Sequence, residues 1–244
     1  MIMKLLALII MTSVSSILAF SQTIEGSWKL IEENGESLNN KEIIAIFQDG
    51  YMALGAKESS NNAFLYAYGG AFSISEEVLT LVQDFNTKQP DMIGMEQSFQ
   101  LKIEEGKIKL SNTKNSQIWG QISESKDNLT RNWVFTGREK DGEVQITTPG
   151  DRRTVKILSG NRFQWIAFNS ATKEFSGTGG GTYEIKDGRY IENITFFSRN
   201  NDRVGAKLEF QYEVNDEKWH HRGKSSAGDP IFEIWSPYEE AYKK

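Results

Sequence analysis

Cysteine is absent from the sequence, and histidine occurs only twice. Without cysteine the chain can form no disulfides, and it offers no thiolate metal ligand or thiol nucleophile. A zinc site is not expected from two histidines alone, and no metal or cofactor is predicted. Proline occurs four times in 244 residues, which excludes a collagen-like or proline-rich chain. The remaining composition is that of an ordinary folded protein.

An excess of positive charge is also lacking. The chain has 28 Lys and Arg against 33 Asp and Glu, so nucleic acid is not an expected partner. No Gly-x-Ser-x-Gly motif and no Ser/His/Asp arrangement is present, so we assign no catalytic residues and predict no reaction. Long apolar runs are missing after the first segment, so we expect no transmembrane segment in the mature chain.

The first 21 residues resemble an export signal. Lys4 supplies a positive start, an apolar stretch follows over 5–11, and the small residues Ala19 and Ser21 precede Gln22. This order predicts a signal peptide over 1–21, cleaved after Ser21. The mature chain would have 244 − 21 = 223 residues and a charge of 27 − 33 = −6. We expect a periplasmic or extracellular protein that has no lipid anchor, and the alternative is a retained N-terminal anchor.

The sequence repeats itself at a constant offset. Ile46 and Ile157 lie 157 − 46 = 111 residues apart. Pairs at the same offset are Phe64 with Phe175, Gly70 with Gly181, Phe72 with Tyr183, Ile74 with Ile185, Gly94 with Gly205, Phe99 with Phe210, Leu101 with Tyr212, and Ile103 with Val214. We therefore expect two domains, 22–124 and 129–244, joined by a short polar linker.

The local pattern is that of β-strands. Apolar residues at 208, 210, 212 and 214 alternate with polar ones, which is typical of a half-buried strand. Turn dipeptides such as Asp49-Gly50 and Asp187-Gly188 separate such segments. In the first half the segments 27–32, 45–51, 64–68, 71–75, 78–84, 98–103 and 107–111 are expected strands. In the second half they are 133–139, 154–158, 162–169, 174–178, 181–186, 189–197, 208–214, 219–224 and 231–236.

A short helical turn near 36–44 is the expected exception, and the triple glycine 179–181 is expected to form a bend or bulge. The fold class is therefore all-β, with about eight strands in each half, enough to close a small antiparallel barrel.

Several motifs resemble a known family. Gly26-Ser27-Trp28 is similar to the first strand of lipocalin-type barrels, and the second half carries the triple glycine followed by Thr182-Tyr183, then Trp219-His220-His221 and Phe232-Glu233-Ile234-Trp235. These segments resemble secreted lipocalin-like domains of Gram-negative bacteria, a family of unknown function. The similarity covers most of 129–244 and is looser in the first half. It implies two tandem lipocalin-like, up-and-down barrels with a calyx, and no established activity.

The candidate site lies in the second half. Trp219 and His221 share one strand face, and Lys218, His220, Arg222 and Lys224 share the other, so we expect the first pair to point inward. The predicted ligand-binding residues are Trp165, Tyr183, Glu192, Phe210, Tyr212, Trp219, His221 and Trp235. Phe196 is a further aromatic candidate for the pocket wall. In the alternative interpretation, these aromatic residues only fill the core, and His221 is bonded to Glu192 or Glu233.

Three functions remain open from the sequence. The first is binding of a small, largely apolar molecule in the C-terminal calyx, with His221 as a polar anchor and no catalysis. The second is an envelope interaction module, with filled barrels and a protein or glycan partner. The third is a hydrolase or isomerase in the calyx, with His221 beside a carboxylate. The first half offers Trp28, Phe47, Phe72, Phe99 and Trp119, but few polar groups are expected on the same faces.

Overall fold

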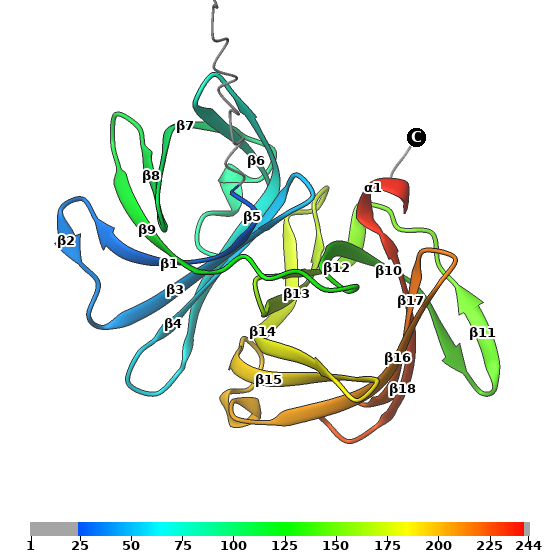
Figure 1. Ribbon diagram of the computed structural model, residues 1–244. Helices are drawn as coiled ribbons and strands as arrows, with labels where there is room; N and C mark the ends of the chain where they lie inside the picture. The colour runs from blue at the N-terminus through cyan, green and yellow to red at the C-terminus, as the bar shows by residue number, and fades with distance from the viewer. Residues whose placement is uncertain (1–23, 242–244) are drawn as a thin grey trace, which may run out of the picture.

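The computed structural model describes residues 24–241 as two closed antiparallel barrels in tandem (Figure 1). The expected signal peptide lies outside the described residues. In the first barrel the strands are β1 (Gly26–Glu33), β2 (Glu36–Ser37), β3 (Lys41–Gln48), β4 (Tyr51–Glu58), β5 (Phe64–Ser75), β6 (Val78–Asn86), β7 (Glu96–Glu104), β8 (Lys107–Ser111) and β9 (Ser116–Ser123).

The second barrel repeats this order. Its strands are β10 (Arg131–Lys140), β11 (Glu143–Ile146), β12 (Arg152–Ser159), β13 (Arg162–Asn169), β14 (Glu174–Lys186), β15 (Arg189–Phe197), β16 (Lys207–Asn215), β17 (Lys218–Lys224) and β18 (Pro230–Pro237). Each ring closes by pairing its first strand with its last, β1 with β9 and β10 with β18. The short strands β2 and β11 lie outside the rings, paired with β1 and β10. The up-and-down barrel architecture predicted from the sequence is confirmed.

Helices are few and short. In the described part of the chain they are η1 (Pro90–Met92), η2 (Asn201–Arg203) and α1 (Tyr238–Ala241). Within residues 24–241, no helix has the length and apolar character needed to cross a bilayer.

Some strand boundaries differ from the sequence-based expectation. The helical turn expected near 36–44 is wrong, because β2 and the first half of β3 lie in that segment. The segment 45–51 is not one strand, since it contains the turn between β3 and β4. The segments 64–68 and 71–75, expected as two strands, form the single strand β5. In the same way, 174–178 and 181–186 form the single strand β14. In both strands a register shift at glycine, Gly69/Gly70 in β5 and Gly180/Gly181 in β14, lets the strand bend without ending.

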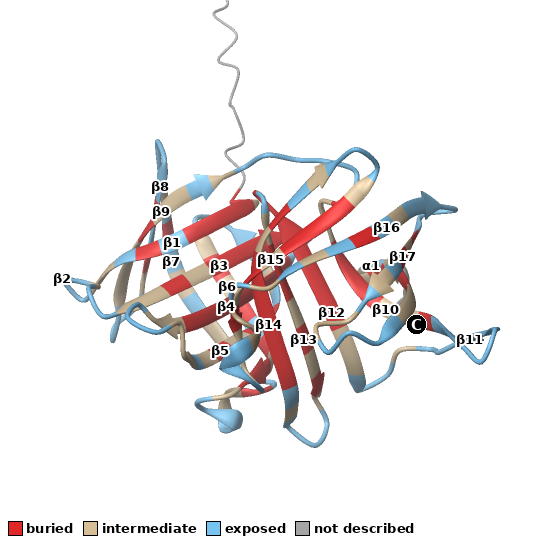
Figure 2. Cartoon of the chain, turned by 90° about the horizontal axis from the view of Figure 1, so that it is seen from below, coloured by how far each residue is buried: buried red, intermediate tan, exposed pale blue. Residues whose placement is uncertain are grey.

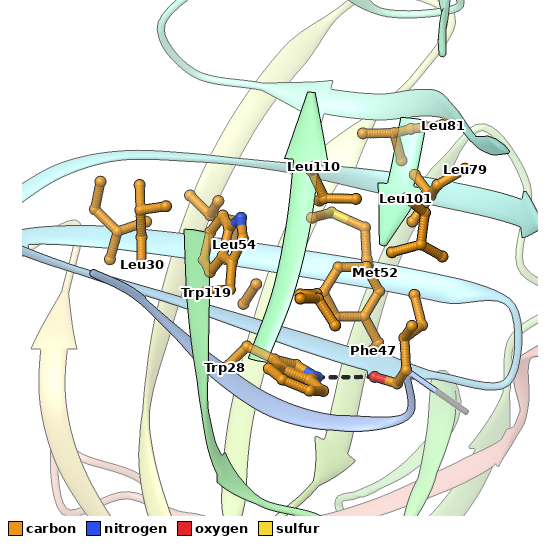
Figure 3. Packing of buried hydrophobic residues seen from close by; sticks show 14 of the residues in the cluster. Trp28, Leu30, Phe47, Met52, Leu54, Leu79, Leu81, Leu101, Leu110 and Trp119 are labelled. Carbon is orange, nitrogen blue, oxygen red and sulfur yellow. Dashed lines mark hydrogen bonds between the residues drawn. The ribbon is translucent and has the colours of Figure 1, made fainter. Parts of the chain in front are cut away.

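The interior of the first barrel is apolar. Trp28, Phe47, Met52 and Trp119 are buried there with leucines from most of the ring (Figure 3). The indole of Trp28 donates to the carbonyl of Ile24 at 2.8 Å, the bond drawn as a dashed line. In the second barrel Trp133 donates in the same way to the carbonyl of Leu129, at 2.9 Å. The two barrels therefore share the contact that fixes the start of the ring.

The barrels pack against each other through equivalent residues. The contact is a cluster of buried apolar residues from both halves: Ile46, Tyr51, Ala53, Ala67, Phe85, Val134, Val155, Ile157, Ile166 and Phe168. Phe64 and Phe175, which are 111 positions apart, stack with ring centroids 6.3 Å apart. Ser159 Oγ donates to Gln48 Oε1 at 2.8 Å, and these two residues are also 159 − 48 = 111 apart. Contacts between equivalent positions are the signature of an approximate two-fold interface.

Strands at this interface are buried on both faces. β4 is buried over its first six residues and β12 over its last five. Figure 2 shows red segments along parts of β3, β4 and β12. One face of each strand points into its own barrel and the other packs on the neighbouring barrel. Alternation of polar and apolar residues is therefore lost in these strands.

Candidate functional site

The second barrel contains a cavity of about 300 Å³. Its inner end is formed by buried side chains, Lys156, Glu192, Phe210, His221 and Trp235. Its outer part is formed by Trp165, Phe197, Leu208 and Ile231, and the exposed Arg199 lies at its rim. The strands β12, β13 and β15 to β18 contribute these residues, so the cavity is a calyx enclosed by the ring. An eight-stranded barrel is wide enough to hold one small ligand in this way.

The structure brings together five of the eight predicted site residues. Trp165, Glu192, Phe210, His221 and Trp235 all line the calyx.

The other three predicted residues lie elsewhere. Tyr183 is buried, and its hydroxyl donates to Asp127 at 2.8 Å. Tyr212 lies in a shallow outer hollow beside His220, and its hydroxyl contacts Asn128. Trp219 is completely buried in the core without lining the cavity. Phe196 points toward the first barrel, where its ring stacks on Phe64.

His221 is held by a carboxylate. Its Nδ1 lies 3.3 Å from Oε2 of Glu233, and the same oxygen accepts a hydrogen bond from the Trp235 indole at 3.2 Å. Burial lowers the pKa of His221 below its ordinary value, and this effect outweighs the opposing carboxylate of Glu233. The pKa of Glu233 is also lowered: burial raises it, but the hydrogen bond from His221 and the nearby Lys156 outweigh that effect. At neutral pH the imidazole is therefore neutral and the carboxylate is ionised.

This pairing fixes the histidine tautomer. An ionised carboxylate only accepts, so Nδ1 carries the proton and Nε2 carries a lone pair. Nε2 is buried and has no hydrogen-bond partner among the described residues. A buried acceptor without a donor costs free energy, on the order of 1–3 kcal/mol. His221, the predicted polar anchor, therefore carries a buried unpaired acceptor and lies at the inner end of the calyx.

A buried lysine, which was not predicted from the sequence, also lies at the inner end of the calyx. Lys156 forms an ion pair with Glu192, and both side chains are only 5% exposed. The ammonium also lies 5.0 Å from the Trp219 ring and 5.1 Å from the Tyr190 ring. The hydroxyl of Tyr190 donates to Glu192 Oε1 at 2.9 Å, so Lys156 and Tyr190 contact the same oxygen. The only sequence signal is a lysine inside the apolar run Val155-Lys156-Ile157.

The first barrel has apolar residues at these inner positions. At an offset of 111, Lys156 corresponds to Ala45, Glu192 to Leu81 and His221 to Leu110. All three belong to the packed apolar core of the first barrel. The charged inner end is therefore a feature of the second barrel alone, and it is not needed to build this fold.

The first barrel has a cavity at its outer end. A cavity of about 210 Å³ there is lined by Gln83, Asn86, Gln97 and Gln117, together with tyrosines and a few apolar residues. The expectation of few polar groups in the first half is therefore wrong. Gln97 and Gln117 lie two residues from Phe99 and Trp119, on the same strand faces, and alternation alone places these amides inward.

Comparisons with known proteins give little further information. No family model and no curated protein matches the chain. Among solved structures, an uncharacterized protein from Bacteroides eggerthii DSM 20697 is similar, with a TM-score of 0.32 and 12% identity. That similarity covers 40% of this chain and 98% of the other. As for metals, residues 24–241 contain no group of three or more His, Asp or Glu side chains placed to hold an ion.

Proposed function

We propose that the C-terminal barrel binds a small, largely apolar molecule that carries a hydrogen-bond donor at one end. The observation that carries this proposal is the calyx itself, with apolar outer walls and the unpaired Nε2 of His221 at its inner end. Burying about 300 Å² of ligand surface would contribute on the order of 7 kcal/mol before association costs. The apolar body supplies affinity, and the donor to His221 supplies orientation.

The charges at the inner end of the calyx determine which polar group of a ligand is favoured there. One lysine, Lys156, faces two glutamates, Glu192 and Glu233, and His221 is neutral. An acidic head group would meet a net negative charge there, whereas an alcohol or amine supplies the missing donor. We therefore expect long-chain alcohols to bind more tightly than the corresponding acids.

A fluorescence titration tests this proposal. N-phenyl-1-naphthylamine is an apolar probe with a single N–H, and its binding is measured directly, followed by competition with decanol and decanoate. We expect decanol to displace the probe more effectively, and His221→Ala to weaken its binding by about tenfold. His220→Ala is the matched control, because that ring lies on the outer face of β17. Equal affinity in both variants would remove His221 from the site.

Material that copurifies with the protein gives a second, independent test. Mass spectrometry of a solvent extract of the purified protein should reveal an apolar compound with an O–H or N–H group. A stoichiometric fatty acid would contradict the proposed selectivity.

A hydrolase or isomerase acting in the same calyx is the second candidate. The pair of His221 and Glu233 favours it, since a neutral imidazole oriented by a carboxylate is the arrangement of a general base. Turnover of p-nitrophenyl butyrate that is lost in His221→Ala and kept in His220→Ala would support catalysis. Absence of turnover, with probe binding intact, leaves binding as the function. The interaction-module hypothesis required filled barrels, and the cavities weigh against it.

We also propose that the protein is exported and that it belongs to the lipocalin-like family. The leader over 1–21 supports secretion to the periplasm or the extracellular space, and the tandem barrels are consistent with the lipocalin-like resemblance. N-terminal sequencing of protein recovered from the producing cells should begin at Gln22. A retained Met1 would contradict the proposed processing.

A further inference from the structure

The cavity of the first barrel is a second calyx that the proposed function leaves unused. Its lining comes from every strand of the ring except β8, together with the segment that follows β6. The apolar side chains of Leu30, Ile43 and Leu54 form its base. The cavity is thus enclosed on all sides by the barrel and open at the outer end.

Its walls are polar but almost uncharged. Six carboxamide side chains and two tyrosines line it: Gln83, Asn86, Gln89, Gln97, Asn115, Gln117, Tyr66 and Tyr68. At the offset of 111, the second barrel has Ile194, Phe197 and Leu208 where the first has Gln83, Asn86 and Gln97. The two calyces therefore occupy equivalent places and have opposite wall chemistry.

Hydrogen bonds between the amides fix their orientation. Asn86 Nδ2 donates to Gln83 Oε1 at 2.7 Å, and Gln83 Nε2 donates to Gln97 Oε1 at 2.5 Å. Asn86 Oδ1 in turn accepts from the backbone N–H of Gln89 at 2.7 Å. This chain leaves Nε2 of Gln97 as a donor with no partner among residues 24–241. The side chains are therefore preorganised, and one end of the chain is free to bind.

The two tyrosines add hydroxyls that have no hydrogen-bond partner in the described part of the chain. Burial raises the pKa of Tyr66 to about 12, and burial also raises the pKa of Tyr68. Both hydroxyls stay protonated at physiological pH and can donate as well as accept. Their rings, with that of Phe99, offer flat apolar faces beside these polar groups.

The charged groups of the lining cancel. Glu33 accepts from Gln117 at 3.2 Å and pairs with Lys41. Lys88 places its ammonium over the Tyr66 ring at 5.1 Å. One acid and one base, each already engaged, leave no net charge to attract an ionic ligand.

We propose that this calyx binds a neutral polyhydroxylated molecule, a monosaccharide or disaccharide. Hydroxyl groups both donate and accept, which matches walls of amides and phenols, and the C–H face of a sugar ring packs on aromatic faces. A peptide would need an open groove or a free strand edge for its backbone, and the closed ring provides neither. The apolar walls of the second calyx would leave the same hydroxyls unpaired.

Nuclear magnetic resonance of the full mature chain tests the proposal. ¹⁵N spectra are recorded with galactose, N-acetylglucosamine and maltose at about 10 mM, a range suited to millimolar dissociation constants. Gluconate, decanol and a neutral dipeptide amide are the comparison compounds. We expect a neutral sugar to shift the amide signals of β5 to β7 around Tyr68 and Gln97. We also expect Tyr68→Phe and Gln97→Leu each to weaken binding by about three- to tenfold.

Gln100→Leu is the matched control, because Gln100 lies on the outer face of β7 and is exposed. It should bind the sugar like the unmodified protein. Dispersed spectra and unchanged binding of N-phenyl-1-naphthylamine by the second barrel will show that each variant is folded. The proposal is overturned if no neutral sugar shifts these signals, if the shifts survive both substitutions, or if gluconate, decanol or the dipeptide amide binds there more tightly. None of these outcomes bears on the C-terminal calyx, so the two proposals fail separately.

Discussion

His221 couples the stability of the second barrel to pH. Its pKa in the folded protein lies below the ordinary value of 6.5, because burial disfavours the charged form beside Lys156. As pH falls below about 6.5, the unfolded chain takes up this proton before the folded chain does, so stability falls. The lowered pKa of Glu233 has the same sign but acts only below its ordinary value of 4.5. A window from about pH 7.5 to about pH 5.5 therefore isolates the histidine.

The corresponding prediction uses His221→Leu, which installs the residue of the equivalent position Leu110. The urea midpoint of the unmodified protein should decrease across this window, and the decrease should be smaller in the variant. Equal slopes in the two proteins would show that His221 is not the group that titrates.

Lys156 illustrates what single residues in the sequence could not reveal. A lysine in a strand is ordinarily expected to face water, and Val155 and Ile157 beside it would then face the core. In the structure all three are buried, because β12 lies between its own lumen and the first barrel. His221 was predictable because β17 keeps one face toward water, so alternation still identified its inward side chains. The ion pair of Lys156 with Glu192 was not predictable, because it depends on how the strands close into a ring.

At the scale of elements, the curvature of a long strand depends on bulges in its neighbour that face glycines, as Thr195 of β15 faces Gly180 and Gly181. A Cβ at Gly181 would lie 1.9 Å from the carbonyl oxygen of Asn193, at the register shift between β14 and β15. Gly181→Ala should therefore lower the free energy of unfolding by about 2–3 kcal/mol in urea denaturation. Gly150→Ala is the control, since nothing lies within 4 Å of its added Cβ. Similar losses in both variants would mean that the bulge does not require glycine.

The strands also show how much of the fold could be predicted from the sequence. The strand over 208–214 and the turns at Asp-Gly dipeptides were predictable from alternation and turn chemistry. The strand β4 was not, because it is buried on both faces and has no alternation to detect. The glycines in β5 and β14 suggested strand ends, whereas register shifts carry the strand through them. The fold class was therefore accessible from local patterns, and the two-sided burial of the interface strands was not.

At the scale of the whole molecule, one carboxylate ties the barrels together. Asp84 of the first barrel pairs with Arg153 of the second at 2.8 Å, and it accepts from the hydroxyls of Tyr51 and Tyr238, each at 3.2 Å. The Arg153 side chain is only 7% exposed. Removing the negative charge would weaken an ion pair that involves a nearly buried guanidinium, which is unfavourable.

Asp84→Asn should lower the free energy of unfolding by about 2–4 kcal/mol. Tryptophan fluorescence during urea denaturation provides the measurement, because both barrels contain buried tryptophans. Asp91→Asn is the control, since that residue is exposed in η1. An Asp84→Asn protein as stable as the control would show that this ion pair is not needed to hold the barrels together.

The approximate two-fold contact between the barrels has a genetic consequence. In a homodimer of identical barrels, every substitution occurs in both copies, so the two calyces stay alike. Here both copies belong to one chain, and a mutation reaches only one of them. Lys156 could arise opposite Ala45, and Gln97 opposite Leu208, while contacts such as Phe64 on Phe175 were kept. Because the two barrels belong to one chain, their interiors can diverge while the residues of the shared interface stay complementary.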